Sequence, residues 1–297
     1  MKNKNCIYTS FNKYYLPQAM LLLNSIKAVY GNKIDVIALV VDEIADEEAI
    51  YFDKFDRVLL ANTLGILDFE SWIRKLSVVE ACTAVKPFAL MKLLDEYSTV
   101  TYMDPDTYLF GPLKEIYESN ENWNIALTPH QLKPATDSYV GIYAELDSFK
   151  FGIFNLGFIS VKTSHQGYAM AEWWAERCYK FCLSKPEIGL FTDQKFFDFA
   201  PVIFENLKII RSSGYNVATW NLSQRILSFH GGRILANDDP LVFCHFTKVQ
   251  NEGLRALERM EIDESLYREI FYSYKNKLKT LKHKLSDMST TWTYLNE

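Results

Sequence analysis

The sequence contains no run of about 18 uninterrupted apolar residues, which is the length that a membrane-spanning helix needs. Its N-terminal segment, MKNKNCIYTSF, also lacks the apolar core of a secretory signal. These two absences argue against a secreted protein and against an integral membrane protein. We therefore expect a cytoplasmic protein.

Glycine and proline are sparse, with 12 and 9 residues in a chain of 297, and no linker rich in Gly, Ser or Pro interrupts the chain before about residue 260. Hydrophobic residues make up 48% of the chain, which is enough for a large buried core. This composition predicts one globular domain over residues 1–260, followed by a C-terminal extension over residues 261–297.

Cysteine is also scarce, and its odd count favours reduced thiols in a cytosolic setting. Two of the five cysteines lie four residues apart on a predicted helix and share one face of it. A metal-binding pair is the alternative there, but no histidine or second cysteine pair is near in the sequence, so we expect buried, unligated thiols. The five residues are Cys6, Cys82, Cys178, Cys182 and Cys244.

An excess of positive charge is absent as well, because the formal net charge is -5. Residues 267–284 carry six Lys or Arg residues and one Glu, a net charge of +5, which leaves -10 for the rest of the chain. An acidic body argues against a nucleic-acid-binding protein, which needs a large basic face.

Strand-like and helix-like segments alternate through the first 130 residues or so, which predicts βαβ units and a mostly parallel sheet. One continuous apolar run, residues 35–41, is typical of a strand that is buried on both faces. The other expected strands cover residues 6–9, 57–60, 99–103, 124–128 and 154–161, and the expected helices cover residues 14–30, 70–81, 87–97 and 167–184.

The strand over residues 99–103 leads directly into Asp104-Pro105-Asp106. Pro105 fixes its own φ and favours an extended Asp104, so two carboxylates are held at a stiff corner, where they repel each other unless a cation lies between them. Such oxygen ligands suit Mg²⁺ or Mn²⁺, which can neutralise a diphosphate leaving group. Asp42 and Asp104 both follow strands, at the edge where open α/β sheets bind ligands. An ordinary turn is the alternative.

Residues 102–107, YMDPDT, resemble the Asp-X-Asp segment of GT-A glycosyltransferases, most closely the retaining enzymes of glycosyltransferase family 8 and their bacterial relatives. The resemblance implies a GT-A, Rossmann-like fold, with a mostly parallel central sheet flanked by helices and a C-terminal helical extension. Two departures from the family are the proline at position 105 and the TKVQ sequence of residues 247–250, where Gly-X-Lys-Pro-Trp is common. Further similar segments follow in family order, namely IYTS at 7–10, FNLGF at 154–158, TDQ at 192–194 and CHF at 244–246.

The resemblance implies metal-dependent transfer of a monosaccharide from a nucleotide-sugar, a UDP-sugar in the first instance, with retention of configuration. The acceptor would be a hydroxyl of a glycan, a lipid-linked glycan or a protein. One alternative is a sugar-phosphate nucleotidyltransferase, but residues 8–12 lack the glycine-rich signature of that class. Another is a non-catalytic nucleotide- or glycan-binding protein, against which the intact acidic pair and His245 count.

The resemblance also assigns roles to residues of the site. The expected metal ligands are Asp104, Asp106 and His245, with Mn²⁺ favoured over Mg²⁺ because imidazole is among them. Asp193 and Gln194 are expected on the reactive face of the sugar. The remaining donor contacts are Tyr8 and Thr9 (nucleoside), Asp42 (base or ribose), Lys86 and Lys248 (diphosphate), Asp104 (ribose), and Asn155 and Gly157 (sugar).

Each of these residue types also has an ordinary structural use. His245 follows an apolar run typical of a buried strand, Asn155 could satisfy a turn, and Asp193 could cap a helix. Lys86 could be a solvated surface charge. His130, which follows a strand, is a weaker candidate for acceptor contact.

The C-terminal extension shows apolar residues at helical spacing between Leu266 and Leu285, with five lysines between them. A basic amphipathic helix can lie on an anionic membrane surface, which would suit a lipid-linked acceptor. The alternatives are a helix that packs on the domain with solvated lysines and a helix that contacts a partner protein.

Overall fold

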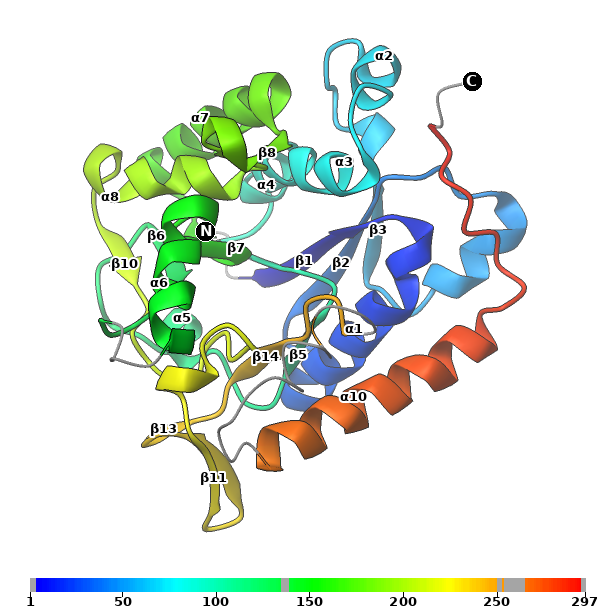
Figure 1. Cartoon of the computed structure of the whole chain (residues 1–297). Helices are drawn as coiled ribbons and strands as arrows, with labels where there is room; N and C mark the ends of the chain where they lie inside the picture. Colours follow the sequence, from blue (N-terminus) through cyan, green and yellow to red (C-terminus); the bar gives the residue numbers. More distant parts are fainter. Residues whose placement is uncertain (1–3, 135–138, 250–252, 254–264, 295–297) are drawn as a thin grey trace.

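The computed structural model describes residues 4–134, 139–249, 253 and 265–294. Its centre is a seven-stranded sheet with strand order β10-β6-β7-β4-β1-β2-β3, flanked by helices (Figure 1). The bounds are β1 Asn5–Phe11, β2 Asp35–Val40, β3 Arg57–Leu60, β4 Thr99–Met103, β6 Ile125–Pro129, β7 Phe154–Lys162 and β10 Leu207–Ile209.

Four of the strand pairs in this sheet are parallel, β1 with β2, β1 with β4, β2 with β3 and β6 with β10. Strand β7 runs antiparallel to both of its neighbours, β4 and β6. The predicted α/β class with a mostly parallel sheet is therefore confirmed, and the antiparallel β7 brings Asn155 and Gly157 beside the end of β4.

The main α-helices are α1 Leu16–Tyr30, α2 Phe69–Ile73, α3 Val78–Ala84, α4 Lys86–Leu94, α5 Lys114–Tyr117, α6 Tyr139–Phe151, α7 His165–Phe181, α8 Ala200–Ile203 and α10 Ser265–Lys284. The 3-10 helices are η1 Lys13–Tyr15, η2 Asp46–Phe52, η3 Ala61–Thr63, η4 Pro186–Ile188, η5 Gln194–Phe199 and η6 Leu222–Gln224. The smaller strands are β5 Thr107–Leu109, β8 Ser184–Lys185, β9 Leu190–Phe191, β11 Leu227–His230, β12 Arg233–Ala236, β13 Asp239–Pro240 and β14 Phe243–His245.

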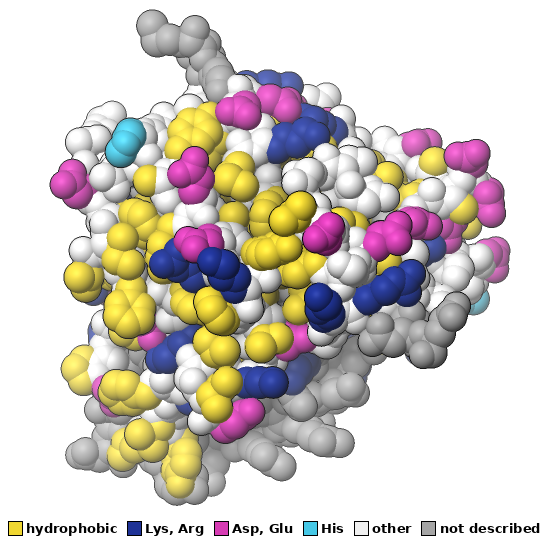
Figure 2. All heavy atoms as spheres, turned by 90° about the horizontal axis from the view of Figure 1, so that it is seen from above, with side chains coloured by type: hydrophobic (Ala, Val, Ile, Leu, Met, Phe, Trp, Pro, Cys, Tyr) yellow, Lys and Arg dark blue, Asp and Glu magenta, His cyan; other side chains and the backbone are white. Residues whose placement is uncertain are grey.

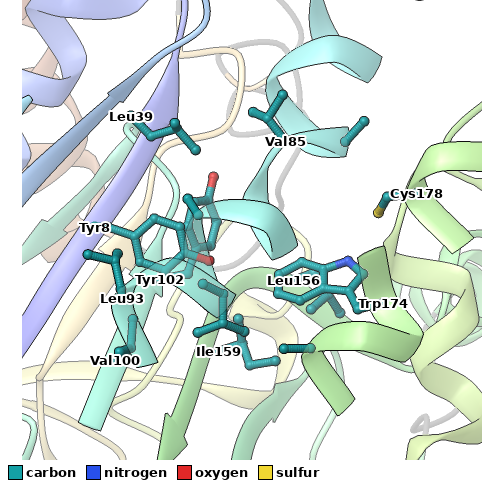
Figure 3. Packing of buried hydrophobic residues seen from close by; sticks show 14 of the residues in the cluster. Tyr8, Leu39, Val85, Leu93, Val100, Tyr102, Leu156, Ile159, Trp174 and Cys178 are labelled. Carbon is teal, nitrogen blue, oxygen red and sulfur yellow. The ribbon is translucent and has the colours of Figure 1, made fainter. Parts of the chain in front are cut away.

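Two apolar layers cover the two faces of the sheet. Side chains alternate along β1, so Cys6 and Tyr8 enter the layer that contains α3, α4 and α7, whereas Ile7 and Phe11 enter the layer that contains α1. Figure 3 shows the first layer, in which the rings of Tyr8 and Tyr102 lie together, their centroids 5.0 Å apart. This packing sets the position of β4, which leads into the acidic turn.

The single helix predicted over residues 70–81 is wrong, because the chain forms α2 and then α3 with a break between them. Ser77 ends the break and caps α3. Its hydroxyl accepts a hydrogen bond from the Glu80 backbone N–H, and the Glu80 carboxylate accepts one from the Ser77 N–H. This reciprocal pair is a capping box, a signature of a helix start that outweighs the continuous helical pattern.

Helix α10 packs on the domain, alongside α1 (Figure 1). Tyr267, Phe271, Tyr274 and Leu278 are buried in a third apolar cluster together with Phe246. Three of its lysines lie over aromatic rings, namely Lys275 over Tyr272, Lys277 over Tyr108 and Lys282 over Tyr14. The apolar side of the predicted amphipathic helix is thus used in packing.

The thiols of Cys178 and Cys182 face the core at the end of α7, and burial raises the pKa of both. On the face drawn in Figure 2, acidic and basic side chains lie intermixed among hydrophobic ones. Within the described parts of the chain, no helix combines the length and the apolar character needed to cross a bilayer.

Candidate functional site

The acidic motif forms a tight turn at the carboxyl end of β4. The backbone N–H of Thr107 donates to the carbonyl of Asp104 at 3.0 Å, and the Thr107 hydroxyl donates to the same oxygen at 2.7 Å. Pro105 occupies the second position of this turn, where its fixed φ is favoured. The N–H of Asp104 donates to the carbonyl of Gly157, so the turn is tied to β7. Both carboxylates are therefore held at the sheet edge.

A two-stranded sheet brings His245 to this turn. Strand β14 pairs antiparallel with β5, with His245 opposite Thr107, and the N–H of Phe246 donates to the carbonyl of Asp106 at 2.8 Å. As a result, His245 Nε2 lies 3.0 Å from an oxygen of Asp106 and 3.7 Å from an oxygen of Asp104. The pairing of β14 with β5 thus brings together Asp106 and His245, which are 139 residues apart in the sequence.

These three side chains fit a divalent metal. One ligand atom from each of Asp104, Asp106 and His245 lies within 4.8 Å of the others. A Cβ at Gly157 would stand 2.5 Å from a ring carbon of His245 and 2.8 Å from an oxygen of Asp104, so the glycine leaves the space in which the three groups converge. Two carboxylates with one imidazole form a donor set able to hold a metal ion.

Charge at the cluster shifts the pKa of its members. Burial lowers the pKa of His245, but Asp106 and then Asp104 outweigh burial and leave it above the ordinary value. Burial likewise raises the pKa of Asp104, but Lys86 and His245 outweigh burial and leave it below the ordinary value. The site thus favours an ionised Asp104 at neutral pH.

Lys86 begins α4 and is buried with its ammonium group among the acidic residues. Its Nζ lies 3.4 Å from Asp104, 3.6 Å from Asp193 and 4.3 Å from the centroid of the Tyr102 ring. Burial lowers the pKa of Lys86, and the two carboxylates raise it further than burial lowers it. Lys86 is therefore a charged group held inside the site and not a solvated surface lysine.

Asp193 lies on the other side of Lys86, just before η5. Its preceding residue, Thr192, adopts a left-handed backbone conformation with φ of 47°, which is uncommon for a β-branched residue. Burial raises the pKa of Asp193 to about 6, and Lys86 opposes that shift. One carboxylate oxygen, Oδ2, is buried with no hydrogen-bond partner among the described residues. An unsatisfied buried oxygen of this kind is available to a ligand.

Gln194 and Asn155 are fixed by hydrogen bonds from the protein itself. Gln194 Oε1 accepts from the N–H of Leu156 at 3.0 Å and from Asn155 Nδ2 at 3.3 Å. The other Asn155 partners are the Gly157 N–H, Asn216 Nδ2 and His130 Nε2. Asn216 is a site residue to which the sequence analysis assigns no role of its own. His130 is partly buried, and burial lowers its pKa to about 4.

The other predicted donor contacts lie in or after neighbouring strands, with Tyr8 and Thr9 in β1, Asp42 after β2 and Lys248 after β14. Tyr8 is fully buried and donates its hydroxyl hydrogen to the carbonyl of Lys86, whereas Thr9 Oγ1 is buried without a hydrogen-bond partner among the described residues. Asp42 accepts hydrogen bonds from the N–H groups of Lys13 and Thr293, and Lys248 is exposed with φ of 50°. The predicted contacts of these four residues with the donor stay predictions.

No protein family model matches the chain. Two uncharacterised proteins of Bacillus subtilis (strain 168) are similar to it. YfnF is 29% identical over 215 residues, which is 71% of this chain and 70% of that protein. YfnD is 27% identical over 173 residues, which is 57% of this chain and 53% of that protein.

Two solved structures share the architecture. The galactosyltransferase LgtC, solved in complex with donor and acceptor sugar analogs, superposes with a TM-score of 0.53 at 13% identity and covers 93% of this chain and 95% of its own. The glycosyltransferase GlyE of Streptococcus pneumoniae TIGR4 superposes with a TM-score of 0.52 at 12% identity, over 98% of this chain and 66% of its own. The predicted GT-A fold is confirmed, and membership of family 8 stays a prediction.

Proposed function

We propose that this chain is a metal-dependent glycosyltransferase that moves a monosaccharide from a nucleotide-sugar to an acceptor hydroxyl. The observation that carries the proposal is the convergence of Asp104, Asp106 and His245 at the carboxyl end of β4, with Lys86 beside them. The GT-A fold puts that convergence at the sheet edge where open α/β proteins bind ligands.

The donor set suits a divalent ion, Mn²⁺ or Mg²⁺, held by Asp104, Asp106 and His245. When bound, the ion would neutralise the charge of a diphosphate leaving group. Lys86 adds a fixed positive charge on the same side, and its two carboxylate neighbours keep it protonated. A fixed ammonium group in a buried site needs no reorganisation as negative charge develops on the departing diphosphate.

The donor sugar would lie against Asp193 and Gln194. Asp193 Oδ2 faces Lys86 Nζ at 3.6 Å but has no hydrogen-bond partner among the described residues, so it can accept a hydrogen bond from a sugar hydroxyl or stabilise positive charge at the anomeric carbon. Gln194 makes three hydrogen bonds to backbone and side-chain groups, which fix both ends of its amide. Its side chain is therefore held in one orientation next to Asp193. Retention of configuration remains an expectation from the family resemblance.

The nucleoside would occupy the edge that follows β1 and β2, and we assign it to a UDP donor in the first instance. Thr9 supports this placement, because its buried hydroxyl has no hydrogen-bond partner within the described ranges. Contacts from Tyr8 and Asp42 to the nucleoside and from Lys248 to the diphosphate belong to the same proposal. We do not favour a nucleotidyltransferase, since the GT-A likeness agrees with sugar transfer.

Turnover of donor sugars is the direct test. The wild-type protein is incubated with UDP-, GDP- and dTDP-sugars, with Mn²⁺ or with a chelator, and released nucleotide is measured. We expect Mn²⁺-dependent release from one donor class, and a loss of about 100-fold or more in Asp106→Asn. The control is Asp53→Asn, because Asp53 is an exposed acidic residue at the end of η2. Absence of metal-dependent turnover across the donor panel would contradict the proposal.

The acceptor, membrane contact and domain division remain parts of this proposal. We divide the chain into a catalytic domain over residues 1–260 and a C-terminal extension over residues 261–297. In the extension, Lys279 and Lys284 of α10 are exposed, and we propose that they contact anionic lipid. Co-sedimentation with phosphatidylglycerol vesicles, compared with neutral vesicles, tests the contact. A glutamate at both lysine positions should abolish sedimentation, and binding that is unaffected would exclude this face of the helix.

A further inference from the structure

A chain of side-chain hydrogen bonds leads from the metal-binding histidine to the residues placed at the donor sugar. His245 Nδ1 lies 3.3 Å from Asn216 Oδ1, and Asn216 Nδ2 donates to Asn155 Oδ1 at 3.1 Å. Asn155 Nδ2 in turn donates to Gln194 Oε1 at 3.3 Å. Asn216 is thus the one link in this chain that contacts both a metal ligand and a sugar-side residue.

The direction of every link in this chain is set by backbone groups, which can act only as donors or only as acceptors. The N–H of Gly157 and the N–H of Leu156 require oxygens, at Asn155 Oδ1 and Gln194 Oε1 respectively. Asn155 must therefore receive a donor from Asn216, which fixes Asn216 with its amide nitrogen towards Asn155 and its oxygen towards His245. It follows that His245 carries a proton on Nδ1, which it donates to Asn216 Oδ1. The other ring nitrogen, Nε2, faces Asp106.

The position of Asn216 is itself constrained. Its side chain is fully buried, and its backbone has a left-handed φ of 55°, which asparagine tolerates better than most residues. Asn221 holds the loop by donating to the Asn216 carbonyl at 2.9 Å. The next residue, Val217, bridges to Cys244 and accepts a hydrogen bond from the His245 N–H, so Asn216 is set beside His245 by the backbone.

We propose that Asn216 is a positioning residue that couples the metal site to the donor-sugar site. Its side-chain oxygen, Oδ1, orients the imidazole of His245 for the metal, as hydrogen-bond partners of metal-binding histidines do. Its amide group fixes Asn155, and through Asn155 the side chain of Gln194. The sugar half of this role rests on the proposed glycosyltransferase function, whereas the His245 half rests on the metal site alone.

A merely structural asparagine in a left-handed turn provides the matched comparison. Asn237 has φ of 52° and also hydrogen-bonds through both ends of its amide, to the Ile226 N–H, Ser213 and the Gln224 carbonyl. Asn237 itself lies in the turn between β12 and β13, and its partners lie just before β11, at the end of η6 and in the loop after β10, so none of them is one of the proposed metal ligands or sugar contacts. Replacement by glycine at either position removes the side chain and leaves the left-handed backbone unstrained.

Metal affinity of the metal-free protein, titrated with Mn²⁺ and followed by calorimetry, separates the two asparagines. We expect Asn216→Gly to weaken Mn²⁺ binding by about 10- to 100-fold and Asn237→Gly to leave it within about twofold. In ¹⁵N NMR spectra of the metal-free protein, His245 should show a proton held on Nδ1 in wild type and in Asn237→Gly. In Asn216→Gly the proton should no longer be held on Nδ1. Equal Mn²⁺ affinities in the two glycine variants would overturn the proposal.

Asn216→Asp tests the two halves separately. A carboxylate still accepts from His245 Nδ1 but presents an oxygen to Asn155 Oδ1, so Mn²⁺ affinity should stay within about threefold while donor turnover falls about 10-fold or more. A loss of Mn²⁺ affinity as large as in Asn216→Gly would overturn the orientation of His245 by Asn216. Wild-type protein that turns over no donor, with the order of Mn²⁺ affinities as expected, would contradict the proposed function and support the metal half.

Discussion

The buried carboxylate of Asp193, which we propose lies against the donor sugar, also affects the stability of the fold. Burial raises its pKa to about 6, and Lys86, 3.6 Å away, only partly opposes the shift. A carboxyl group whose pKa is higher in the folded state stabilises that state below its unfolded pKa of about 3.9, and this contribution is lost as the pH rises through about 6. At pH 8 the ionised carboxylate is therefore expected to destabilise the folded protein.

We predict that Asp193→Asn unfolds with a higher free energy than wild type at pH 8, by roughly 3 kcal/mol, and that this difference shrinks to about 0.5 kcal/mol at pH 4. Donor turnover should be lost in the same variant. Urea denaturation at pH 4, 6 and 8, in the presence of a chelator, measures the difference. Asp53→Asn, at an exposed position, is the control for loss of a carboxylate. A gap between Asp193→Asn and wild type that is independent of pH would exclude the assigned environment.

Prediction at the level of residues succeeded where chemistry-bearing types stand out in the sequence. Asp104 and Asp106 were identifiable because paired carboxylates after an apolar strand suggest ligands, and His245 was identifiable through the family resemblance. The structure brings them together as a candidate metal site. Asn216 carried no comparable signal, since a buried amide acts only through neighbours that are distant in the sequence, such as His245 and Asn155.

At the scale of elements, the central strands followed from local pattern and their long-range pairs did not. The apolar run at residues 35–41 and the strand at residues 99–103 correspond to β2 and β4. Strands β5 and β14, with three residues each, are too short for period-two alternation to be read, and their pairing closes a long loop. That pair, and not β4, decides where His245 meets Asp106.

Helix α10 supports this pair from outside. The ring of Tyr274 stacks on Phe246, with centroids 4.1 Å apart, and meets Tyr108 of β5 edge-on at 6.2 Å. Because Phe246 follows His245 directly and donates to the Asp106 carbonyl, the helix supports two of the proposed metal ligands. The C-terminal extension is therefore part of the framework of the site, whatever its exposed lysines contact.

We predict that Tyr274→Ala lowers the free energy of unfolding by about 3 kcal/mol, because it removes a buried aromatic ring from a packed cluster. Tyr272→Ala, on the exposed side of the same helix, should change it by less than about 0.5 kcal/mol. Tyr274→Phe should be nearly neutral, since the buried hydroxyl has no hydrogen-bond partner among the described residues. Chemical denaturation of the three variants measures these values. Similar losses for both alanine variants would show that α10 is not packed as described.

For the whole molecule, the site unites elements from both halves of the chain, so that a ligand bound there restrains most of the fold. Lys86 comes from α4, the two aspartates from the turn after β4, Asp193 from the segment before η5, and His245 from β14. Any ligand that binds only the folded state stabilises it by mass action, by about 2.7 kcal/mol at a concentration 100 times its Kd. Global stability is thus a readout of the site.

Metal and nucleotide should therefore stabilise the protein together more than either does alone. We expect UDP with Mn²⁺ to raise Tm by roughly 5–10 °C, because 1 kcal/mol corresponds to about 2–4 °C for a chain somewhat shorter than this one. UDP with a chelator should have a much smaller effect, since the acidic cluster would then repel the diphosphate. In Asp106→Asn the joint shift should largely disappear, while Asp53→Asn should retain it. Differential scanning fluorimetry measures these shifts, and an equal rise with chelator present would show that the nucleotide binds without the metal and away from the turn.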